Sequence, residues 1–352
     1  MSYHFFSDPE FAGPGSRDLI RFWDRKPRQL RHMPRQNLPQ FRFPNSQILG
    51  YVEKACFSDA NEISVFWNNY YTGNDWKFRC TSKDIENWMN EGFILIMRDM
   101  SDNTSMIIAT FVCHILKKGV FCGTQIPIAG LLDGLVVHPK LRGCGLASYM
   151  LCAMDKEVYR IPEMKQAILL WFREHDSAFY SAIQTPIAVF EYMYIKISDI
   201  PLRSSKANVA DAQIVDKIVN LVFLNSAKKF TLSARNSFHK NIHWFTVNST
   251  LIGIADTHRI SNNGFVIWEV IFASNFEEPY FVNLQESIEI ASLNLPCDKG
   301  VVFASNCKTR GNLSYLNKPW CIGTSGFLSV HVYNWMPPTF INGDILFPYS
   351  CI

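Results

Sequence analysis

The chain has 352 residues, which is enough for one large domain or two domains of ordinary size. Hydrophobic residues make up 48% of the chain and charged residues 18%, so a substantial core is expected and the composition argues against wholesale disorder. The net charge of +3 is too small to indicate nucleic-acid binding by itself.

The cysteines and the N-terminus indicate the compartment. The ten cysteines include no Cys-x-x-Cys pair, and the first residues lack the charged leader and long apolar core of a signal peptide. We therefore expect reduced thiols and a cytoplasmic protein. The longest apolar stretch, near Met106–Leu116, is too short to span a bilayer, so no membrane span is expected.

The chain begins with polar and basic segments. Residues 1–17 are polar and rich in glycine and proline, and we expect a flexible arm there. Arg25–Arg35 contains five Lys or Arg residues and two prolines, so it is expected to be non-helical. It is either a solvated arm or a contact with phosphate groups.

Helical and extended patterns follow. Apolar spacing predicts helices over Ser46–Trp67 and Ser82–Glu91, with Ser82 as a candidate cap, and strands over Phe93–Arg98, Ser105–Leu116, Val120–Ile128 and Leu131–Val137, with a turn at Lys117–Gly119. The stretch Asn69–Cys80 reads as a polar and aromatic loop. The four strands are expected to form a meander.

The stretch Leu131–Met150 combines a strand, a glycine turn and a helix. Backbone N–H groups at the start of a helix point outward, and glycines allow a pyrophosphate to approach closely. Arg142 adds positive charge beside Gly143 and Gly145, so the turn suits an anion. Glycines at a strand–helix junction are also common as plain turn residues, so both interpretations stay open at this point.

Further elements lie on both sides of a break near Ile200-Pro201. The pattern predicts strands over Met164–Trp171, Gln184–Lys196, Thr250–Ala255, Phe265–Phe272 and Val301–Ala304, and helices over Asp211–Phe223 and Glu286–Leu293. Asn262-Asn263-Gly264 is typical of a hairpin turn.

The sequence of the glycine turn resembles motifs of known protein families. Arg142-x-x-Gly145-x-Ala147 after a strand resembles the acyl-CoA loop of the GNAT superfamily of N-acetyltransferases. The longer stretch Val137–Ala147 resembles N-myristoyltransferase, which has VHKKLR followed by an apolar residue and alanine. Weaker matches to that family follow in the same order along the chain, at Phe22-Trp23, Tyr70–Arg79, Thr185–Tyr194, Ser274 and Cys321–Trp335.

The resemblance implies a fold and a domain division. The implied fold is α/β, with two acetyltransferase-like (GNAT) halves related by pseudo-twofold symmetry around a mixed, saddle-like sheet. Residues 18–200 would form the N-terminal half, which binds acyl-CoA, and residues 201–352 the C-terminal half, which binds the peptide. A monomer is expected.

The implied reaction is transfer of a myristoyl group from myristoyl-CoA to the α-amine of an N-terminal glycine. No prosthetic group and no metal is implied. The backbone N–H groups of Gly134 and Leu135 stand where the family polarises the thioester carbonyl. The family's base is the terminal carboxylate of its own chain, which here belongs to Ile352. Gly343–Phe347 can occupy the family's usual ending and displace that carboxylate, or the tail bends and still delivers it.

The acyl-CoA site is implied by a second set of positions. Its members are Phe22, Trp23, Val136, Val137, Arg142, Gly143, Cys144, Gly145, Leu146 and Ala147. Cys144 and Gly145 replace basic residues of the family, so phosphate binding would depend on backbone N–H groups and Arg142. The phosphates that Arg25–Arg35 could contact are those of CoA or of ribosomal RNA, the latter as a weak ribosome association.

The peptide side is implied by a third set, which consists of Tyr70, Asp75, Phe78, Arg79, Tyr192, Tyr194, Ser274, Ser325 and Gly326. The family's acidic cluster is reduced to Asp75 in this loop, and Ser325 replaces an aspartate, so weaker discrimination for lysine in the substrate is expected. The aromatic members also fit as buried anchors of a surface loop or as ordinary strand residues.

Three functions remain under consideration. The first is an active N-myristoyltransferase-like enzyme. The second is a binding module of the same fold that holds acyl-CoA or peptide without turnover. The third is a transferase that uses a different acyl-CoA or a different amine.

Overall fold

The computed structural model describes residues 28–29, 41–42, 49–99, 105–121, 124–165, 167–174, 184–203, 206–225, 230–232, 241–275, 284–297, 299–305, 316–333, 335–336 and 345–346. The predicted arm at residues 1–17, the aromatic pair Phe22-Trp23 and the terminal Ile352 lie outside these residues. Of the basic segment Arg25–Arg35, only residues 28–29 are described.

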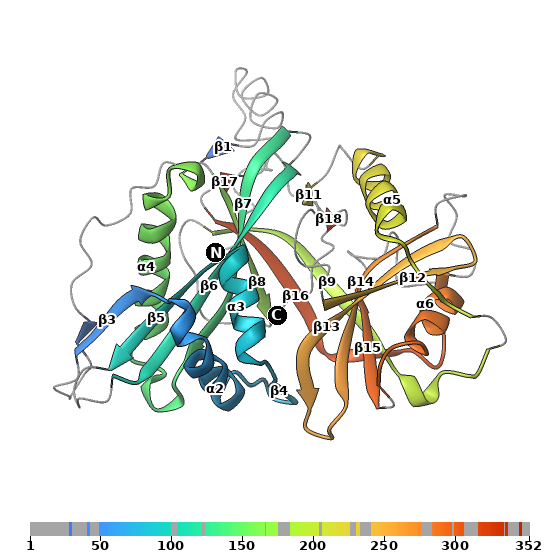
Figure 1. The fold of residues 1–352 in the computed structure, drawn as a ribbon, viewed down its shortest axis with the longest axis horizontal. Helices are drawn as coiled ribbons and strands as arrows, with labels where there is room; N and C mark the ends of the chain where they lie inside the picture. Colours follow the sequence, from blue (N-terminus) through green and yellow to red (C-terminus); the bar gives the residue numbers. More distant parts are fainter. Residues whose placement is uncertain are drawn as a thin grey trace, which may run out of the picture.

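One mixed sheet of sixteen strands runs through both halves of the molecule (Figure 1). Its main path runs in the order β10 (Asn208–Val209), β12 (Ile242–Val247), β13 (Thr250–Ser261), β14 (Val266–Asn275), β15 (Gly300–Ser305), β9 (Gln184–Lys196), β16 (Cys321–Tyr333), β8 (Ile168–Glu174), β7 (Thr124–Val137), β6 (Ile107–Phe121), β5 (Gly92–Asp99), β3 (Leu49–Lys54) and β2 (Phe41–Arg42). The short strands β4 (Trp76–Phe78), β11 (Phe230–Leu232) and β18 (Ile345–Leu346) join it off this path, and β1 (Arg28–Gln29) pairs separately with β17 (Trp335–Met336).

The order of the strands is symmetric about the centre of the sheet. In the first half, β5, β6 and β7 form an antiparallel meander and β7 pairs with β8 in parallel. In the second half, β12, β13 and β14 form an antiparallel meander and β14 pairs with β15 in parallel. Helices α4 (Leu146–Arg160) and α6 (Leu284–Ser292) make the two parallel crossovers. The predicted pair of α/β halves around a mixed sheet is therefore confirmed.

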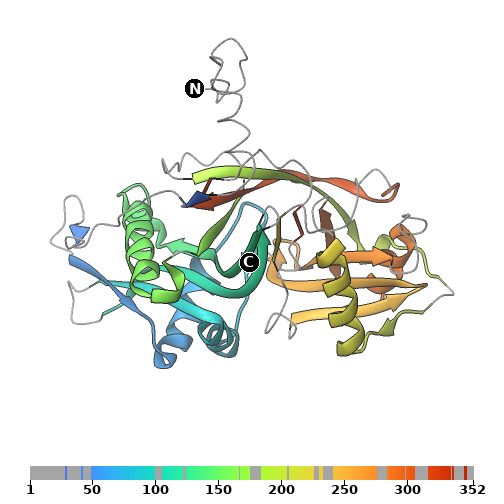
Figure 2. The same cartoon turned by 90° about the horizontal axis from the view of Figure 1, so that it is seen from above.

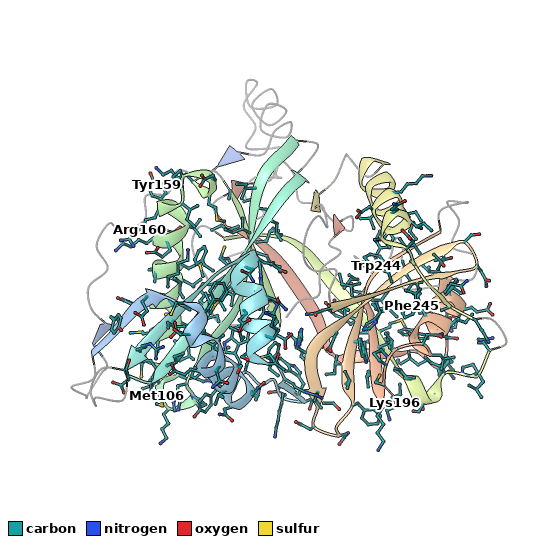
Figure 3. All side chains as sticks on the ribbon, viewed as in Figure 1. Met106, Tyr159, Arg160, Lys196, Trp244 and Phe245 are labelled. Atoms are coloured by element: carbon teal, nitrogen blue, oxygen red, sulfur yellow. The ribbon has the colours of Figure 1, made fainter. Side chains whose placement is uncertain are left out.

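The two central strands are exchanged between the halves. β9 follows β8 in the chain but pairs with β15 of the second half, and β16 follows β15 but pairs with β8 of the first half. Both strands cross from one wing of the molecule to the other (Figure 2). Lys196, at the end of β9, accordingly lies in the same wing as Trp244 and Phe245 (Figure 3). The domain boundary at residue 200 stays a prediction. β9 lies before it in the chain but pairs with the second half, and β16 lies after it but pairs with the first half.

Helices cover both faces of the first half. α2 (Ala60–Tyr70) and α3 (Ser82–Glu91) pack on one face and α4 packs on the other. Along β5, Ile94 and Ile96 face α2 and α3, whereas Phe93 and Leu95 face α4. A strand buried on both faces reads as a continuous apolar run, which explains the sequence of β5.

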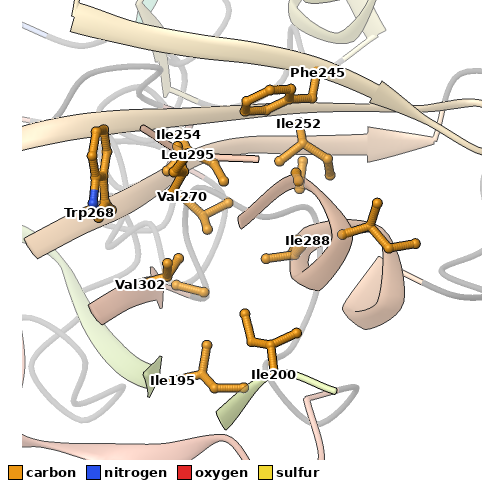
Figure 4. Packing of buried hydrophobic residues seen from close by; sticks show 14 of the residues in the cluster. Ile195, Ile200, Phe245, Ile252, Ile254, Trp268, Val270, Ile288, Leu295 and Val302 are labelled. Atoms are coloured by element: carbon orange, nitrogen blue, oxygen red, sulfur yellow. The ribbon is translucent and has the colours of Figure 1, made fainter. Parts of the chain in front are cut away.

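The second half is covered in the same way. Ile288 of α6 packs against Ile252, Val270 and Val302 of the sheet (Figure 4). α5 (Ala212–Asn225) lies on the opposite face, where Val215 and its neighbours on that helix contact Leu251, Ala255 and Ile271.

Three local predictions were wrong. Part of the predicted helix Ser46–Trp67 is the strand β3, because pairing with β5 overrides the apolar spacing of this segment. Lys117–Gly119 lies inside β6 and is not a turn, since the ladder between β6 and β7 continues to Phe121 and Thr124. The cap of α3 is Thr81, whose hydroxyl accepts a hydrogen bond from the Asp84 N–H, in a capping box.

The polar and aromatic loop after α2 is a hairpin that joins the two halves. Thr72 bridges to Lys77, and β4 then pairs with β13 of the second half. The Arg79 N–H donates to the His258 carbonyl at 2.6 Å, and the Asn262 N–H donates to the Asp75 carbonyl at 2.9 Å. The loop is therefore fixed to the second half by backbone hydrogen bonds.

The helices carry no sign of a membrane span. Among the described residues, none is both long and apolar enough to cross a bilayer.

Candidate functional site

A β-bulge interrupts β7 at Gly134. Between Asp133 and Val136, β7 has one residue more than β6 has between Thr110 and Val112. Gly134 has φ +59, and a Cβ there would lie 2.8 Å from atoms of both Trp67 and Val112. The position therefore requires glycine both for its backbone conformation and for space.

Buried hydrogen bonds hold the bulge in place. The Gly134 carbonyl accepts from the Thr110 hydroxyl at 3.1 Å, and that hydroxyl accepts from the Trp67 Nε1–H at 2.8 Å. Trp67 and Thr110 are both fully buried. A chain of buried, satisfied groups of this kind gives the backbone one well-defined conformation.

β7 separates from β8 at the bulge. The parallel pairing begins at Ala129 and Ile168 and ends at Leu132 and Trp171, so β7 continues past Leu132 without a β8 partner. A ligand can approach the backbone of a strand only along an edge that no other strand occupies. Gly134 and Leu135, the predicted donors to a thioester carbonyl, lie in this unpaired part, and Val136 and Val137 complete it.

The loop between β7 and α4 has the geometry predicted for an anion site. Gly143 and Gly145 have φ of +81 and +80, and a Cβ at either position would meet no atom within 4 Å. Gly145 is the N-cap of α4, so Leu146 and Ala147 form the first turn, where N–H groups point out of the helix. The glycines are needed for the backbone conformation here, and the space around them is open.

Arg142 is exposed at the mouth of this loop. Its Nε donates to the Val137 carbonyl at 3.2 Å and one Nη donates to the Tyr70 carbonyl at 3.3 Å. These bonds fold the side chain over the end of β7. The Cys144 thiol lies 4.0 Å from the Arg142 carbonyl, a contact typical of a turn residue.

Tyr70, predicted on the peptide side, lies beside the anion loop. Its ring packs edge-on against His138 at 4.6 Å between centroids. Burial lowers the pKa of His138, and the nearby Lys140 and Arg142 lower it further. His138 is therefore neutral near pH 7, and the positive charge at this corner comes from Lys140 and Arg142.

Asp133 is a residue of this site that the sequence analysis did not select. Its Oδ1 accepts from the Gly134 N–H at 2.6 Å and from the Tyr71 hydroxyl at 3.2 Å. The Gly134 N–H is thus engaged by a carboxylate in this structure, which bears directly on its predicted role as a donor to the thioester. A lone carboxylate in the apolar run 131–137 was the signal that could have identified Asp133.

Of the predicted peptide residues in the hairpin, one is buried and two are exposed. Phe78 is 3% exposed and packs against Trp67, Tyr71 and Trp88, as a core residue does. Asp75 and Arg79 have exposed side chains beside the second half.

Predicted peptide residues also lie on one face of the sheet where β9 joins the second half. The Tyr194 ring lies 5.5 Å from that of Phe303, and the Tyr192 hydroxyl donates to Glu269 at 3.4 Å. Glu269 is 4% exposed, a buried carboxylate that the sequence analysis also missed although it interrupts an apolar strand. Ser274 is buried on β14, on the face that α5 covers further along the sheet.

Four predicted positions have no described side chain. Phe22, Trp23 and Ile352 lie outside the described residues. Ser325 lies within β16, where the pairing with β9 shifts register between Ile322 and Phe327, and only its backbone and that of Gly326 are described.

Comparison with known proteins identifies the fold. No protein-family model and no curated protein matches the chain. A solved structure of Saccharomyces cerevisiae N-myristoyltransferase with bound myristoyl-CoA is similar, with a TM-score of 0.61 and 12% identity over 89% of this chain and 83% of that one. Another, of the same yeast enzyme with myristoyl-CoA and inhibitors, has a TM-score of 0.61 and 13% identity over 89% and 84% of the two chains. The predicted resemblance to N-myristoyltransferase is therefore confirmed for the fold, at low sequence identity.

Proposed function

We propose that this chain is an N-acyltransferase that transfers a myristoyl group from myristoyl-CoA to the amine of an N-terminal glycine. The observation that carries the proposal is the bulged end of β7, which leaves β8 and leads through two left-handed glycines into the N-terminus of α4. This arrangement occurs in a fold whose similar solved structures hold myristoyl-CoA.

The proposed reaction is a direct attack. The amine nitrogen forms a bond to the thioester carbonyl carbon, the C–S bond breaks, and CoA leaves as the thiol after taking up a proton. The carbonyl oxygen gains negative charge during the attack, and backbone N–H groups at Gly134 and Leu135 would stabilise it. The amine must also lose a proton, which requires a base within reach.

The anion loop would hold the CoA phosphates. The N–H groups of Gly143 to Ala147 and the positive end of α4 favour an anion, and the exposed Arg142 adds a full charge. Phe22 and Trp23 stay predicted contacts of CoA, and Val136 and Val137 would line the path of the thioester.

The peptide would contact both the hairpin and the second half. Asp75 and Arg79 would contact it from the hairpin, and Tyr70 from the end of α2. Tyr192, Tyr194 and Ser274 belong to the other side, together with Ser325 and Gly326. The terminal carboxylate of Ile352, the cytoplasmic location and a ribosome contact through Arg25–Arg35 stay predictions.

A mass-spectrometric transfer assay tests the proposal. The purified protein is mixed with acyl-CoAs of several chain lengths and with peptides that begin with glycine, alanine or acetyl-glycine. We expect a myristoyl group on the peptides with a free N-terminal glycine and on no other peptide. Transfer of a different acyl group would retain the acyltransferase and change its substrate.

A non-catalytic binding module is the second candidate. It is favoured by the 2.6 Å hydrogen bond that engages the Gly134 N–H, because a donor already bound to Asp133 is lost to an oxyanion. Saturable binding of myristoyl-CoA measured by calorimetry, with no product in the same sample, would select this candidate over the enzyme.

A further inference from the structure

We infer that Asp133 is the general base that removes the proton from the attacking amine. This inference rests on the proposed acyl transfer and adds to it a residue for a step otherwise left to the chain terminus. It is carried by three features of the described residues: the position of Asp133 along β7, the face to which it points, and two donors that bind one of its oxygens.

Asp133 occupies the first position of β7 beyond its pairing with β8. The last pair is Leu132 with Trp171, and the bulge begins at the next residue, Gly134. The carboxylate is therefore adjacent in sequence to the proposed oxyanion donors, of which the Leu135 N–H would receive the thioester carbonyl while the Gly134 N–H holds Asp133. A base must lie within hydrogen-bond reach of the proton it removes, and an amine that attacks at the bulge would arrive next to Asp133.

The carboxylate points to the face opposite the anion loop. Leu132 and Leu135 pack with α4, whereas Val136 packs with α2 and α3. Asp133 bonds to Tyr71, which directly follows α2, so its side chain belongs to the α2 face. An acyl-CoA held by the N-terminus of α4 and an amine that arrives from the α2 face would meet at the unpaired edge of β7.

Two donors fix the orientation of the carboxylate. Both the Gly134 N–H and the Tyr71 hydroxyl bind Oδ1. Tyr71 is itself held by stacking on Phe78 at 4.9 Å and by edge contacts with Trp67 and Trp76 at 5.8 and 5.5 Å. A base with its rotamer locked by neighbours is positioned before the substrate arrives.

The proton balance is simple. The ammonium nitrogen transfers one proton to the Asp133 carboxylate as its lone pair attacks the carbonyl carbon. The second proton passes to the departing thiolate of CoA as the amide forms, and Asp133 then releases the first proton to solvent. Tyr71 is a positioning residue in this step, because it acts through Asp133.

The surrounding titratable groups bear on the pH dependence. The hydroxyl of Tyr71 comes from the end of α2, and His138 comes from the end of β7 beside Tyr70. Lys140 and Arg142 follow in the same loop. Burial and these two cations lower the pKa of His138, so that ring is neutral above pH 7 and carries no charge that would change with pH there.

The test compares Asp133→Asn with the unaltered full chain. Asparagine keeps an oxygen for the Gly134 N–H and for Tyr71 but cannot accept a proton at neutral pH. We expect kcat for transfer to an N-terminal glycine peptide to fall about 100-fold or more at pH 7, while the Kd for myristoyl-CoA is unchanged. The deficit should shrink toward about pH 9, where the amine, with an ordinary pKa near 8, is already deprotonated. Asp133→Glu should restore part of kcat.

Two further variants make the result decisive. Tyr71→Phe should lower kcat several-fold without a change in the Kd for myristoyl-CoA, and it tests the same carboxylate if Asp133→Asn does not fold. Asp216→Asn, an exposed aspartate of α5, should have no effect.

The outcomes separate the two proposals. If the unaltered chain transfers myristate and Asp133→Asn does so with the same kcat at pH 7, the assignment of Asp133 is overturned and the acyltransferase stands. A folded Asp133→Asn whose deficit is equal at pH 7 and pH 9 overturns the assignment as well. If the unaltered chain transfers no acyl group, the proposed function fails and the role of Asp133 fails with it.

Discussion

In the first half, the backbone conformation, the surrounding space and the burial of single residues limit which substitutions are tolerated. Gly134 needs a left-handed backbone and has no room for a side chain, whereas Gly143 and Gly145 need only the backbone conformation. His114 of β6 is fully buried, which lowers its pKa to about 4. Each of these differences leads to a measurable effect of substitution.

Gly134→Ala should destabilise the fold by about 3 kcal/mol, since it combines left-handed strain with contacts of 2.8 Å to Trp67 and Val112. Gly264→Ala is the matched control, because Gly264 also has a positive φ but open space, and about 1 kcal/mol is expected there. Urea unfolding of both variants gives the comparison. Equal losses in the two variants would contradict the packing constraint at Gly134.

His114 should make the fold less stable in acid. Its folded pKa of about 4 lies below an unfolded value of 6.5, so the neutral ring is favoured in the fold. The stability that it contributes is fully present above pH 6.5 and is lost as the pH falls toward 4, by up to about 3 kcal/mol. His114→Met should remove this pH-dependent contribution to stability. The free energy of unfolding of the variant should then change less with pH between pH 7 and 4. Parallel curves for the two proteins would show that His114 does not titrate as inferred.

At the scale of elements, sequence patterns predicted the helices and turns whose formation depends on nearby residues. The helices α5 and α6 and the hairpin turn at Asn262–Gly264 were found close to their observed bounds. The strand β3 was missed, because its choice of strand over helix depends on a partner, β5, far along the chain. The length of the β6–β7 ladder depends likewise on pairing and not on the residues of either strand alone.

The candidate site was predictable only in part for the same reason. The glycine loop could be identified because its spacing lies within one short stretch. The contact of Asp133 with Tyr71 joins residues 62 positions apart, and only the folded bulge brings them together. The packing of Phe78 in a cluster of three aromatic rings likewise depends on α2 and α3.

The first turn of α4 should respond to charge in two opposite ways. Ser148→Asp places a carboxylate in the exposed first turn, where it should stabilise the helix by about 0.5 kcal/mol. The same charge should repel the CoA phosphates and raise the Kd for myristoyl-CoA, measured by calorimetry. Gln213→Glu in the first turn of α5 should give a similar stability gain and an unchanged Kd. An unchanged Kd in Ser148→Asp would place the phosphates elsewhere.

At the scale of the whole molecule, the exchange of β9 and β16 ties the two halves into one sheet. Each half would lose its edge partner if the other unfolded, because β9 pairs with β15 and β16 pairs with β8. The β4–β13 pairing adds a second connection. Both halves also contain a β-bulge in the third strand of the meander, at Ile271 in β14 and at Gly134 in β7.

Thermal unfolding should therefore be a single cooperative transition. Calorimetry should show one peak, and circular dichroism and tryptophan fluorescence should give the same midpoint, because Trp67 reports on the first half and Trp268 on the second. Two peaks, or midpoints that differ between the probes, would show that the halves unfold separately despite the shared strands.

The exchanged strands also bear on how such a chain could have originated. A protein with one half alone would lack a partner for its outgoing strand, and a second copy that offers the same strand in return would complete both sheets. That assembly is a twofold dimer with swapped strands. Joining two copies through the segment 197–211 converts the association into an intramolecular one, so it no longer depends on concentration. Once joined, the copies are free to diverge, which fits a chain in which a glycine loop precedes α4 in one half and the buried carboxylate of Glu269 lies on β14 in the other.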